Sequence, residues 1–270
     1  MNKAYYENKV CVITGASTGI GYALAGKLLE LGATVYMVAR TKSKLAEALE
    51  SYKAYGNKVH TVSCDVSDND AVRQMIDNVF GTEGRIDFLF NNAGIGSAGL
   101  TERASIKAWK RVIDTNLWGV IYATHAVLPI MLAQGSGHIV NTSSIGGLVP
   151  LPYQTLYCTS KYAVTGFSET LRNEMAPRGI GVSVVCPGAV ATEIFTKGGQ
   201  KTPAHAITPE ASADIILEGV ANKEGIIVVG EDAKARYELS MKDPEGFEAR
   251  QKLDYHKKYE IFVMGVKHDW

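Results

Sequence analysis

Short apolar runs rich in β-branched residues alternate along the chain with longer stretches in which apolar residues recur at helical spacing. The apolar runs predict strands at residues 9–14, 33–40, 58–66, 86–90, 137–142, 181–188 and 225–229. The intervening stretches predict helices, among them residues 43–54, 68–80, 106–134, 157–175 and 208–221. This alternation predicts one mainly parallel, doubly wound α/β sheet of about seven strands, with helices on both faces in three layers. Ligands of such a sheet bind at the carboxyl ends of its strands.

The stretch at residues 106–134 is predicted to be one long helix with a break near Pro129. It contains Asn116, an amide in otherwise apolar surroundings. Its second half, residues 117–134, comes closest to a membrane span, but it carries His125 and barely reaches the minimum length. We therefore expect a buried helix and no membrane span.

Two later segments carry less periodicity. Residues 193–205 contain glycine and lysine in no regular pattern, which predicts a lid over the substrate. The tail at residues 230–270 is charged and aromatic, and it could pack on the subunit surface, join a partner or border the substrate pocket. No linker divides the chain, so we expect a single domain over residues 1–270, with a core at 8–230 and a C-terminal extension at 231–270.

The composition is that of an ordinary globular protein, with 46% hydrophobic and 21% charged residues among 270. Basic and acidic residues both number 28, so the net charge is zero and no basic field indicates a nucleic-acid or anionic membrane partner. A small molecule is the expected partner. The N-terminus lacks the apolar core of a signal peptide, and the four cysteines show no metal-ligand spacing. We expect reduced, buried thiols in a cytoplasmic protein without a metal.

A glycine-rich turn follows the first predicted strand directly. Its sequence, TGASTGIG, holds Gly15, Gly19 and Gly21, and a helical apolar pattern begins at Ile20. Small residues there let the backbone approach a pyrophosphate, and the N-terminus of the following helix faces its negative charge. Strand, turn and helix together predict a Rossmann-like dinucleotide-binding fold.

The end of the second strand bears on the choice of cofactor. An NAD-binding chain typically offers an acid about 20 residues after the glycines, whereas an arginine suits the 2′-phosphate of NADP. Here the strand ends in Ala39 and Arg40, and the nearest acids are Glu30 and Glu47. We therefore predict NADP(H) and keep NAD(H) as the alternative.

Three further strand ends offer small and polar residues to the cofactor. The third strand ends in Asp65 and Val66, which are in position to face the adenine. Asn91-Asn92-Ala93-Gly94 follows the fourth strand and suits a backbone that passes close to a ribose, although Asn-Asn equally suits a turn. The sixth strand ends in Pro187-Gly188, with Thr192 after it, close to where a nicotinamide would lie.

The candidate chemistry lies between the fifth strand and the helix after it. Tyr157 and Lys161 are four residues apart, so on a helix they lie on one face, one turn from each other. An unperturbed tyrosine titrates near pH ~10, and a neighbouring ammonium favours the phenolate, which brings the phenol closer to neutral pH. Ser144 stands 13 residues before Tyr157, at a strand end, so the fold can bring the two hydroxyls together. Tyr5 and Lys9 share this spacing, but they lie in a polar tail and receive no chemical role.

Taken together, these residues resemble the short-chain dehydrogenase/reductase family over about residues 9–229. The matching motifs, in chain order, are Thr14-Gly15-x-x-x-Gly19-x-Gly21, Asp65, Asn91-Asn92-Ala93-Gly94, Asn116, Ser144, Tyr157-x-x-x-Lys161 and Pro187-Gly188 with Thr192. The resemblance implies an NADP(H)-dependent oxidoreductase that interconverts a ketone and a secondary alcohol by hydride transfer.

The resemblance also implies a catalytic tetrad of Asn116, Ser144, Tyr157 and Lys161. Tyr157 would exchange a proton with the substrate oxygen as a general acid or base, and Ser144 would position that oxygen. Lys161 would lower the pKa of the phenol and bind the nicotinamide ribose, while Asn116 would hold a water that links Lys161 to solvent. The implied cofactor contacts are Gly15, Ser17, Thr18, Gly19, Ile20, Gly21, Arg40, Asp65, Val66, Asn92, Ala93, Gly94, Tyr157, Lys161, Pro187, Gly188, Val190 and Thr192.

The chain departs from the family pattern at one position. NADP-preferring members also place a basic residue inside the glycine turn, whereas this turn holds Ser17 and Thr18. Family members are often homodimers or homotetramers built on the two helices that here contain Asn116 and Tyr157. The resemblance therefore implies self-association.

The motifs leave the substrate open. Apolar and aromatic residues near the expected pocket favour a bulky apolar alcohol or ketone, steroid-like or with an acyl chain, but they equally suit packing between subunits. These residues are Leu148, Val149, Leu151, Tyr153, Ile194 and Phe195. Other functions also stay open: a catalytically silent dinucleotide-sensing protein, a structural scaffold, and an NAD-dependent dehydrogenase of the same family.

Overall fold

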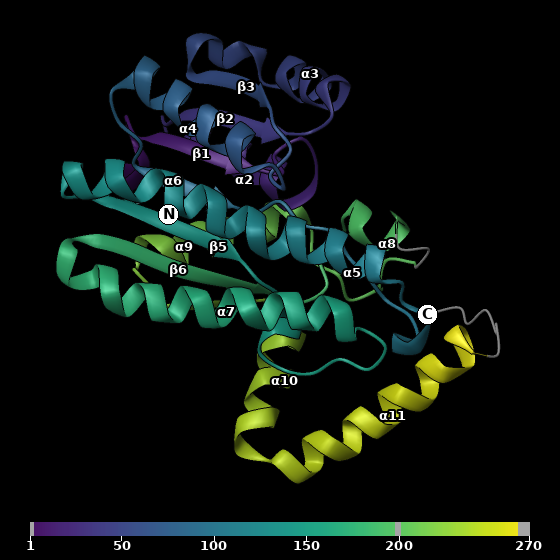
Figure 1. Ribbon diagram of the computed structural model, residues 1–270. Helices are drawn as coiled ribbons and strands as arrows, with labels where there is room; N and C mark the ends of the chain where they lie inside the picture. Colours follow the sequence, from purple (N-terminus) through teal and green to yellow (C-terminus); the bar gives the residue numbers. More distant parts are fainter. Residues whose placement is uncertain (1–2, 198–200, 264–270) are drawn as a thin grey trace.

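The computed structural model describes residues 3–197 and 201–263, and its core is one parallel sheet between two layers of helices (Figure 1). The seven strands lie in the order β3-β2-β1-β4-β5-β6-β7. Their bounds are β1 (Val10–Thr14), β2 (Thr34–Ala39), β3 (Val59–Ser63), β4 (Phe88–Asn91), β5 (Gly137–Thr142), β6 (Ile180–Pro187) and β7 (Ile226–Val229). The order reverses between β1 and β4, and such a reversal opens a ligand crevice at the carboxyl ends of the two strands. The predicted doubly wound α/β fold is confirmed.

The strands form where the sequence predicts them. β1, with the sequence VCVIT, is buried along its whole length, as expected for a strand covered on both faces. β5 matches its predicted bounds at both ends. β3 stops at Ser63, so Asp65 and Val66 lie in the turn after it rather than in the strand.

Each face of the sheet is covered by amphipathic helices. One face carries α1 (Lys3–Tyr6), α2 (Gly19–Glu30), α3 (Lys42–Ser51) and α9 (Pro209–Ala221), and the other carries α4 (Asn69–Glu83), α5 (Ile106–Ile113), α6 (Gly119–Gln134) and α7 (Thr155–Met175). Short 3-10 turns lie at Lys53–Lys58, Thr101–Arg103, Ile145–Gly147 and Ala176–Arg178. The side chain of Tyr6 is fully buried and donates to the carbonyl of Leu217 at 2.6 Å, so the polar N-terminal tail docks on the fold.

The long helix predicted at residues 106–134 is interrupted, but not at Pro129. α5 passes into a π-helical turn, Asp114–Trp118, and α6 then continues through Pro129. The prediction of a break near Pro129 was wrong because a proline removes one backbone hydrogen bond, and the packing of α6 on α4 and the sheet holds the helix around it. Within the described residues, Ile106–Gln134 is the one stretch with the length and hydropathy of a membrane span. Apolar side chains of α6, among them Ala123, Val127 and Met131, pack in the core of the protein.

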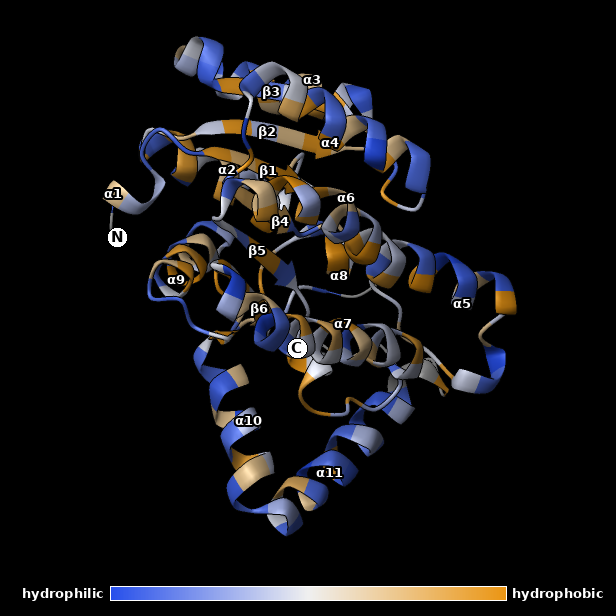
Figure 2. Cartoon of the chain, turned by 60° about the vertical axis from the view of Figure 1, so that its left-hand side comes forward, coloured by the Kyte–Doolittle hydropathy of each residue, from blue (hydrophilic) through white to orange (hydrophobic). Residues whose placement is uncertain are grey.

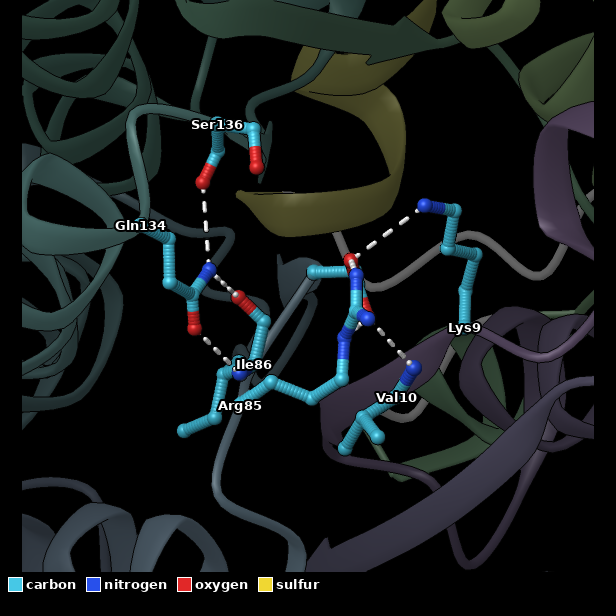
Figure 3. A network of polar contacts seen from close by, with 7 residues as sticks. Lys9, Val10, Arg85, Ile86, Gln134 and Ser136 are labelled. Carbon is cyan, nitrogen blue, oxygen red and sulfur yellow. Dashed lines mark hydrogen bonds and ion pairs between the residues drawn. The ribbon is translucent and has the colours of Figure 1, made fainter.

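A polar network around Asp87 joins the amino ends of β1 and β4 (Figure 3). The Asp87 carboxylate accepts from the Val10 amide at 2.9 Å and from the Arg85 guanidinium at 2.8 Å. The Gln134 side chain accepts from the Ile86 amide at 2.9 Å and donates to the Ile86 carbonyl at 3.0 Å. The Gln134 side chain thus takes the backbone N–H and C=O of Ile86, which lies before the first residue of β4, Phe88, whereas Asp87 still bonds to Val10 and His138 through its backbone.

The two segments with little periodicity contain helices. The predicted lid includes α8 (Glu193–Lys197), and residues 198–200 of it lie outside the described residues. The tail folds into α10 (Glu231–Lys242) and α11 (Pro244–Phe262), while residues 264–270 lie outside the described residues. Figures 1 and 2 show α10 and α11 as a V-shaped hairpin that stands out from the body and is mostly hydrophilic.

Candidate active site

The glycine turn packs directly on the loop that follows β4. Gly15 and Gly19 have φ angles of +67° and +61°, a region that favours glycine. A Cβ atom on Gly15 would lie 2.8 Å from the Cα atom of Ala93, and one on Gly21 would lie 2.4 Å from the carbonyl oxygen of Gly15. The turn therefore excludes side chains at these positions for reasons of space as well as conformation.

Thr14 and Asn92 lock the turn to that loop. The Thr14 hydroxyl accepts from the backbone amides of Asn92 at 3.0 Å and Ala93 at 3.1 Å. The Asn92 side chain in turn donates to the carbonyls of Thr14 at 3.2 Å and Gly15 at 3.3 Å. Asn92 thus holds the ends of β1 and β4 together. It does more than form a local Asn-Asn turn, because its side chain bonds to the backbone of Thr14 and Gly15.

The start of α2 has the properties of a phosphate site. Thr18 is the N-cap residue, and its side chain makes no capping hydrogen bond. A cavity of about 300 Å³ opens beside it, lined by Ser17, Thr18, Tyr22, Lys44, Glu47, Ala48, Ser51 and Glu193. An uncapped helix N-terminus beside hydroxyls and an ammonium fits the phosphates of a dinucleotide.

The segment that enters α8 lies across the mouth of this region. The Thr192 side chain contacts the start of α2, where a Cβ atom on Gly19 would lie 3.0 Å from Thr192 Cγ2. Glu193 forms an ion pair with Lys44 of α3 at 2.8 Å. A Cβ atom on Gly96 would lie 3.0 Å from Ile194 Cγ1, so Ile194 packs over the loop after β4. Thr192 and the first two lid residues, Glu193 and Ile194, therefore contact three different parts of the structure.

Tyr157, Lys161 and Ser144 converge at the carboxyl ends of β5 and β6. Lys161 Nζ lies 5.7 Å from the centre of the Tyr157 ring and donates to the Thr142 carbonyl at 2.9 Å. Ser144 is buried after β5; its hydroxyl accepts from the Gly146 amide at 3.1 Å. The predicted proximity of the two hydroxyls and the ammonium is present.

The ionisation of the pair differs from the expectation. Loss of hydration raises the pKa of Tyr157 to about 12, against a smaller lowering by the Ser144 hydroxyl. Burial lowers the pKa of Lys161 from 10.5 to about 8. The Lys161 ammonium lies near the Tyr157 ring and bonds to the Thr142 carbonyl. In the free protein, desolvation of the phenol outweighs any lowering of its pKa by this ammonium. The expected lowering of the phenol pKa by Lys161 is therefore not found in the free protein.

Asn116 lies in the π-helical turn and is fully buried. Its side-chain oxygen accepts from the Ile95 amide at 2.8 Å, and its side-chain nitrogen donates to the Ile95 carbonyl at 3.0 Å and to Ser160 Oγ at 3.1 Å. The amide thus ties the loop after β4 to α7 one residue before Lys161. These bonds use both N–H groups and one lone pair of the side chain, and the water expected between Asn116 and Lys161 stays a prediction.

Other predicted cofactor residues lie around the same crevice. A Cβ atom on Gly94 would lie 3.4 Å from both Asn116 Oδ1 and Lys161 Nζ, so the backbone there borders the reaction centre. Gly188 and Val190 follow β6; Gly188 packs on α10, and Val190 bridges to the segment before α9.

Arg40, Asp65 and Val66 lie at the far side of the crevice. The Arg40 guanidinium is 3.5 Å from the Asp65 carboxylate, and 73% of the Arg40 side chain is exposed. Val66 is buried against α6, where a Cβ atom on Gly119 would lie 2.9 Å from Val66 Cγ2. The Val66 side chain therefore belongs to the core, and only its backbone is available to an adenine.

The predicted pocket residues divide into two groups. Val149 is 1% exposed and packs in a small core with Ile145 and Ala233, to which Leu148 and Leu151 add contacts. Ile194, which is 37% exposed on α8, remains available to a substrate. Val149 is thus a packing residue rather than part of an open pocket wall.

Lys44 was not predicted as a cofactor residue, although its position in the sequence offered one indication. The residue sits inside a predicted helix and matches no motif. It follows Arg40 by four residues, on the first turn of the helix that leaves the cofactor edge of the sheet.

Comparisons with known proteins agree with this geometry. Residues 9–203 match the family described as short chain dehydrogenase. The 3-oxoacyl-(acyl-carrier-protein) reductase FabG of Thermotoga maritima is 36% identical over 234 residues, which cover 83% of this chain and 95% of that protein. A short-chain dehydrogenase/reductase of Burkholderia phymatum, solved with NAD, has a TM-score of 0.84 and 29% identity, and covers 89% of this chain and 95% of its own.

A second solved structure, ElxO with NADP bound, has a TM-score of 0.77 and 26% identity, and covers 84% of this chain and 99% of its own. The neighbours thus include both an NAD and an NADP complex. The resemblance that the motifs predict is confirmed at the level of the family: the chain belongs to the short-chain dehydrogenases/reductases, oxidoreductases that bind a nicotinamide dinucleotide.

Proposed function

We propose that the protein is an NADP(H)-dependent carbonyl reductase in which Tyr157 is the proton donor. The observation that carries this proposal is the convergence of Tyr157, Ser144 and Lys161 beside the crevice that the glycine turn borders. A silent dinucleotide sensor needs the glycine turn alone, and a scaffold needs neither. The intact tetrad therefore favours catalysis over both.

The reaction adds a hydride to the carbonyl carbon and a proton to the carbonyl oxygen. Bound NADPH supplies the hydride. Ser144 donates a hydrogen bond to the carbonyl oxygen, and Tyr157 gives that oxygen its phenolic proton. Lys161, held at 2.9 Å from the Thr142 carbonyl, binds the nicotinamide ribose and stabilises the phenolate left behind.

The raised pKa of Tyr157 keeps the phenol protonated, which is the form that reduction needs. With a pKa of about 12, the phenol is protonated at neutral pH and ready to act as an acid. Alcohol oxidation needs the phenolate instead, and in the free protein desolvation disfavours that form.

Two cations at the adenosine end of the crevice support NADP(H). Arg40 directly follows β2, where a typical NAD-binding chain carries an acid, and Lys44 lies in the wall of the cavity beside Ser17 and Thr18. Lys44 thereby provides through space the basic group that the glycine turn lacks. An ammonium and a guanidinium suit a 2′-phosphate, which carries charge that NAD does not.

The substrate that fits best is a bulky apolar ketone, steroid-like or with an acyl chain. Ile194 of the lid contacts the loop after β4, and the neighbouring Phe195 is partly exposed, so both offer apolar surface. The FabG relative is named as a reductase of 3-oxoacyl chains, which supports an acyl substrate.

The test of this function is a panel of ketones with NADPH. Acetoacetyl-CoA, a 3-oxosteroid and acetone are each offered to the purified protein, and the decay of NADPH fluorescence is followed. We expect turnover of a bulky ketone and little turnover of acetone. Binding of NADPH with no consumption across the panel would favour the silent sensor, and no binding at all would favour the scaffold.

We also propose self-association and a cytoplasmic location. Trp118 and Tyr162, on the two helical segments that carry Asn116 and Tyr157, are 43% and 42% exposed, which suits a homodimer or homotetramer interface. All four cysteines are free and buried, which suits a reducing compartment. Analytical ultracentrifugation of Trp118→Ala beside the wild type tests the assembly, since a monomeric wild type would contradict it.

A further inference from the structure

The helix α11 contacts the loop that joins Ser144 to Tyr157. Gln251 Nε2 donates to the Pro150 carbonyl at 2.6 Å, and Lys258 Nζ donates to the Pro152 carbonyl at 3.1 Å. Between these two bonds, the rings of Tyr255 and Tyr153 stack with centroids 5.3 Å apart and an interplanar angle of 17°. Three side chains of one helix thus hold one short loop.

The three side chains come from a single face of α11. Gln251, Tyr255 and Lys258 follow each other at helical spacing; Gln251 and Lys258 are half-buried, while Tyr255 is 45% exposed beside its contact with Tyr153. Loss of hydration lowers the pKa of the Lys258 ammonium, which is consistent with its position against the loop. The tail therefore presents a specific contact face to the body.

The loop is strained at the point where the tyrosine stack forms. Tyr153 has a φ angle of +63°, which is unfavourable for a residue with a side chain. Its carbonyl accepts from the Gly99 amide at 2.8 Å, and its ring lies on Tyr255. A conformation of this kind persists only where its surroundings fix it.

The rest of the hairpin supports the same contact. A small core of Ile145, Val149 and Ala233 lies between the loop and α10. The Arg236–Asp254 ion pair, at 2.8 Å and with side chains 15% and 22% exposed, joins α10 to α11. The angle of the hairpin is thereby fixed, and the loop is enclosed between the body and the tail.

We propose that α11 is a clamp on the active-site loop. Gln251, Tyr255 and Lys258 hold residues 148–153 so that Ser144 and Tyr157, at the two ends of the segment, keep the relative positions needed to bind one substrate oxygen. They are positioning residues, because they touch the loop rather than the reacting atoms. The match to the family model ends at residue 203, so α11 lies beyond it. Its effect on turnover rests on the proposed function, but the contact with the loop does not.

Hydrogen–deuterium exchange tests the clamp without a substrate. In Tyr255→Ala, we expect the Gly99 amide and residues 146–154 to exchange up to about tenfold faster, which is the loss expected for one aromatic stack. Exchange in β1 and the glycine turn stays unchanged. Tyr255→Phe keeps the stack and removes only the hydroxyl that bonds to Tyr153, so it restores most of the protection, and Lys257→Ala is the matched surface control on the same helix.

Two outcomes overturn the proposal. The first is faster exchange confined to α10 and α11, with the loop still protected. The second is equal loss of protection in Tyr255→Phe and Tyr255→Ala. Gln251→Ala, which removes the Pro150 bond, repeats the test if Tyr255→Ala fails to fold.

Kinetics provide the functional arm. With the ketone that the wild type reduces fastest, Tyr255→Ala loses up to about tenfold in kcat/KM while the Kd for NADPH stays within about twofold. Unchanged kcat/KM, or an equal loss of NADPH binding, contradicts the positioning role. If the wild type reduces no ketone, the proposed function fails while the exchange measurement still decides the clamp.

Discussion

Lys44 Nζ lies 2.8 Å from Glu193 Oε1, so α3 and the first turn of α8 are joined across the cavity that contains Ser17 and Thr18. The lysine is partly buried there, within reach of a phosphate bound at the start of α2. The same ammonium can therefore hold the lid and recognise the 2′-phosphate that distinguishes NADP from NAD.

Lys44→Gln is expected to weaken NADP⁺ binding by about tenfold and leave NAD⁺ binding unchanged, because a hydrogen bond to a charged group contributes about 1.5–3 kcal/mol. Glu193→Gln is expected to tighten NADP⁺ binding, because it removes a negative charge beside the phosphate. Isothermal titration calorimetry of both cofactors measures the effects.

Lys53→Gln is the matched control for that experiment. Like Lys44, Lys53 forms an ion pair with a glutamate. Its partner is Glu50 of α3, and the pair lies on an exposed surface outside the cavity lining. If Lys44→Gln weakens both cofactors equally, the residue serves the lid alone and the 2′-phosphate is recognised elsewhere.

Lys161→Met should make the protein more stable while it abolishes turnover. Burial lowers the pKa of Lys161 from 10.5 to about 8, so between these values the unfolded chain binds more protons and stability rises with pH. At neutral pH the buried charge therefore costs about 3 kcal/mol. Lys161→Met removes this cost but also removes the hydrogen bond to the Thr142 carbonyl. The expected net increase in the free energy of unfolding is therefore about 1–3 kcal/mol.

Urea unfolding at neutral pH measures the change, with Lys257→Met as a surface control. A variant less stable than the wild type would mean that the ammonium is a structural support. Such a trade between stability and activity is common where an active site buries a charge.

His138 should make the protein sensitive to mild acid. It is 2% exposed, and its two ring nitrogens bond to the Tyr5 hydroxyl at 3.1 Å and to Ser183 Oγ at 2.9 Å. Burial lowers its pKa from 6.5 to about 4, so the folded state holds it neutral while the unfolded state takes up a proton. Stability that is complete above pH 6.5 is then lost as the pH falls towards 4, by about 3 kcal/mol.

A series of urea unfolding curves across this pH range measures the loss. His138→Gln serves as the reference, because glutamine does not titrate and any remaining slope belongs to carboxylates. The same pH dependence in both proteins would contradict the assignment to His138.

The positions of the strands and the proximity of Ser144 to Tyr157 followed from local pattern. Apolar runs with β-branched residues set the strands, and parallel strands bring their carboxyl ends together without further information. For that reason Ser144 after β5 and Tyr157 on α7 could be placed side by side from the sequence. The glycine turn was also predicted from its sequence. The structure explains the glycine at position 15, because a Cβ atom there would collide with Ala93.

What escaped prediction depends on contacts between distant segments. Pro129 is a local signal for a break, but the packing of α6 overrides it and the interruption falls in the π-helical turn. The Lys44–Glu193 pair joins residues 149 positions apart, and no spacing rule reports it. The pKa of Tyr157 was expected to be lowered, because the four-residue spacing reveals the nearby Lys161 ammonium. Burial of the phenol, which raises the pKa, cannot be deduced from that spacing.

Proton donation by Tyr157 is the central claim, and Tyr157→Phe tests it most directly. NADPH oxidation is followed for the wild type and the variant with the ketone that the wild type reduces fastest, beside a titration of NADPH binding. The account predicts that the variant binds NADPH with a Kd within about twofold of the wild type and loses about 10²–10⁴-fold in kcat. A variant that reduces the ketone at the wild-type rate would contradict it.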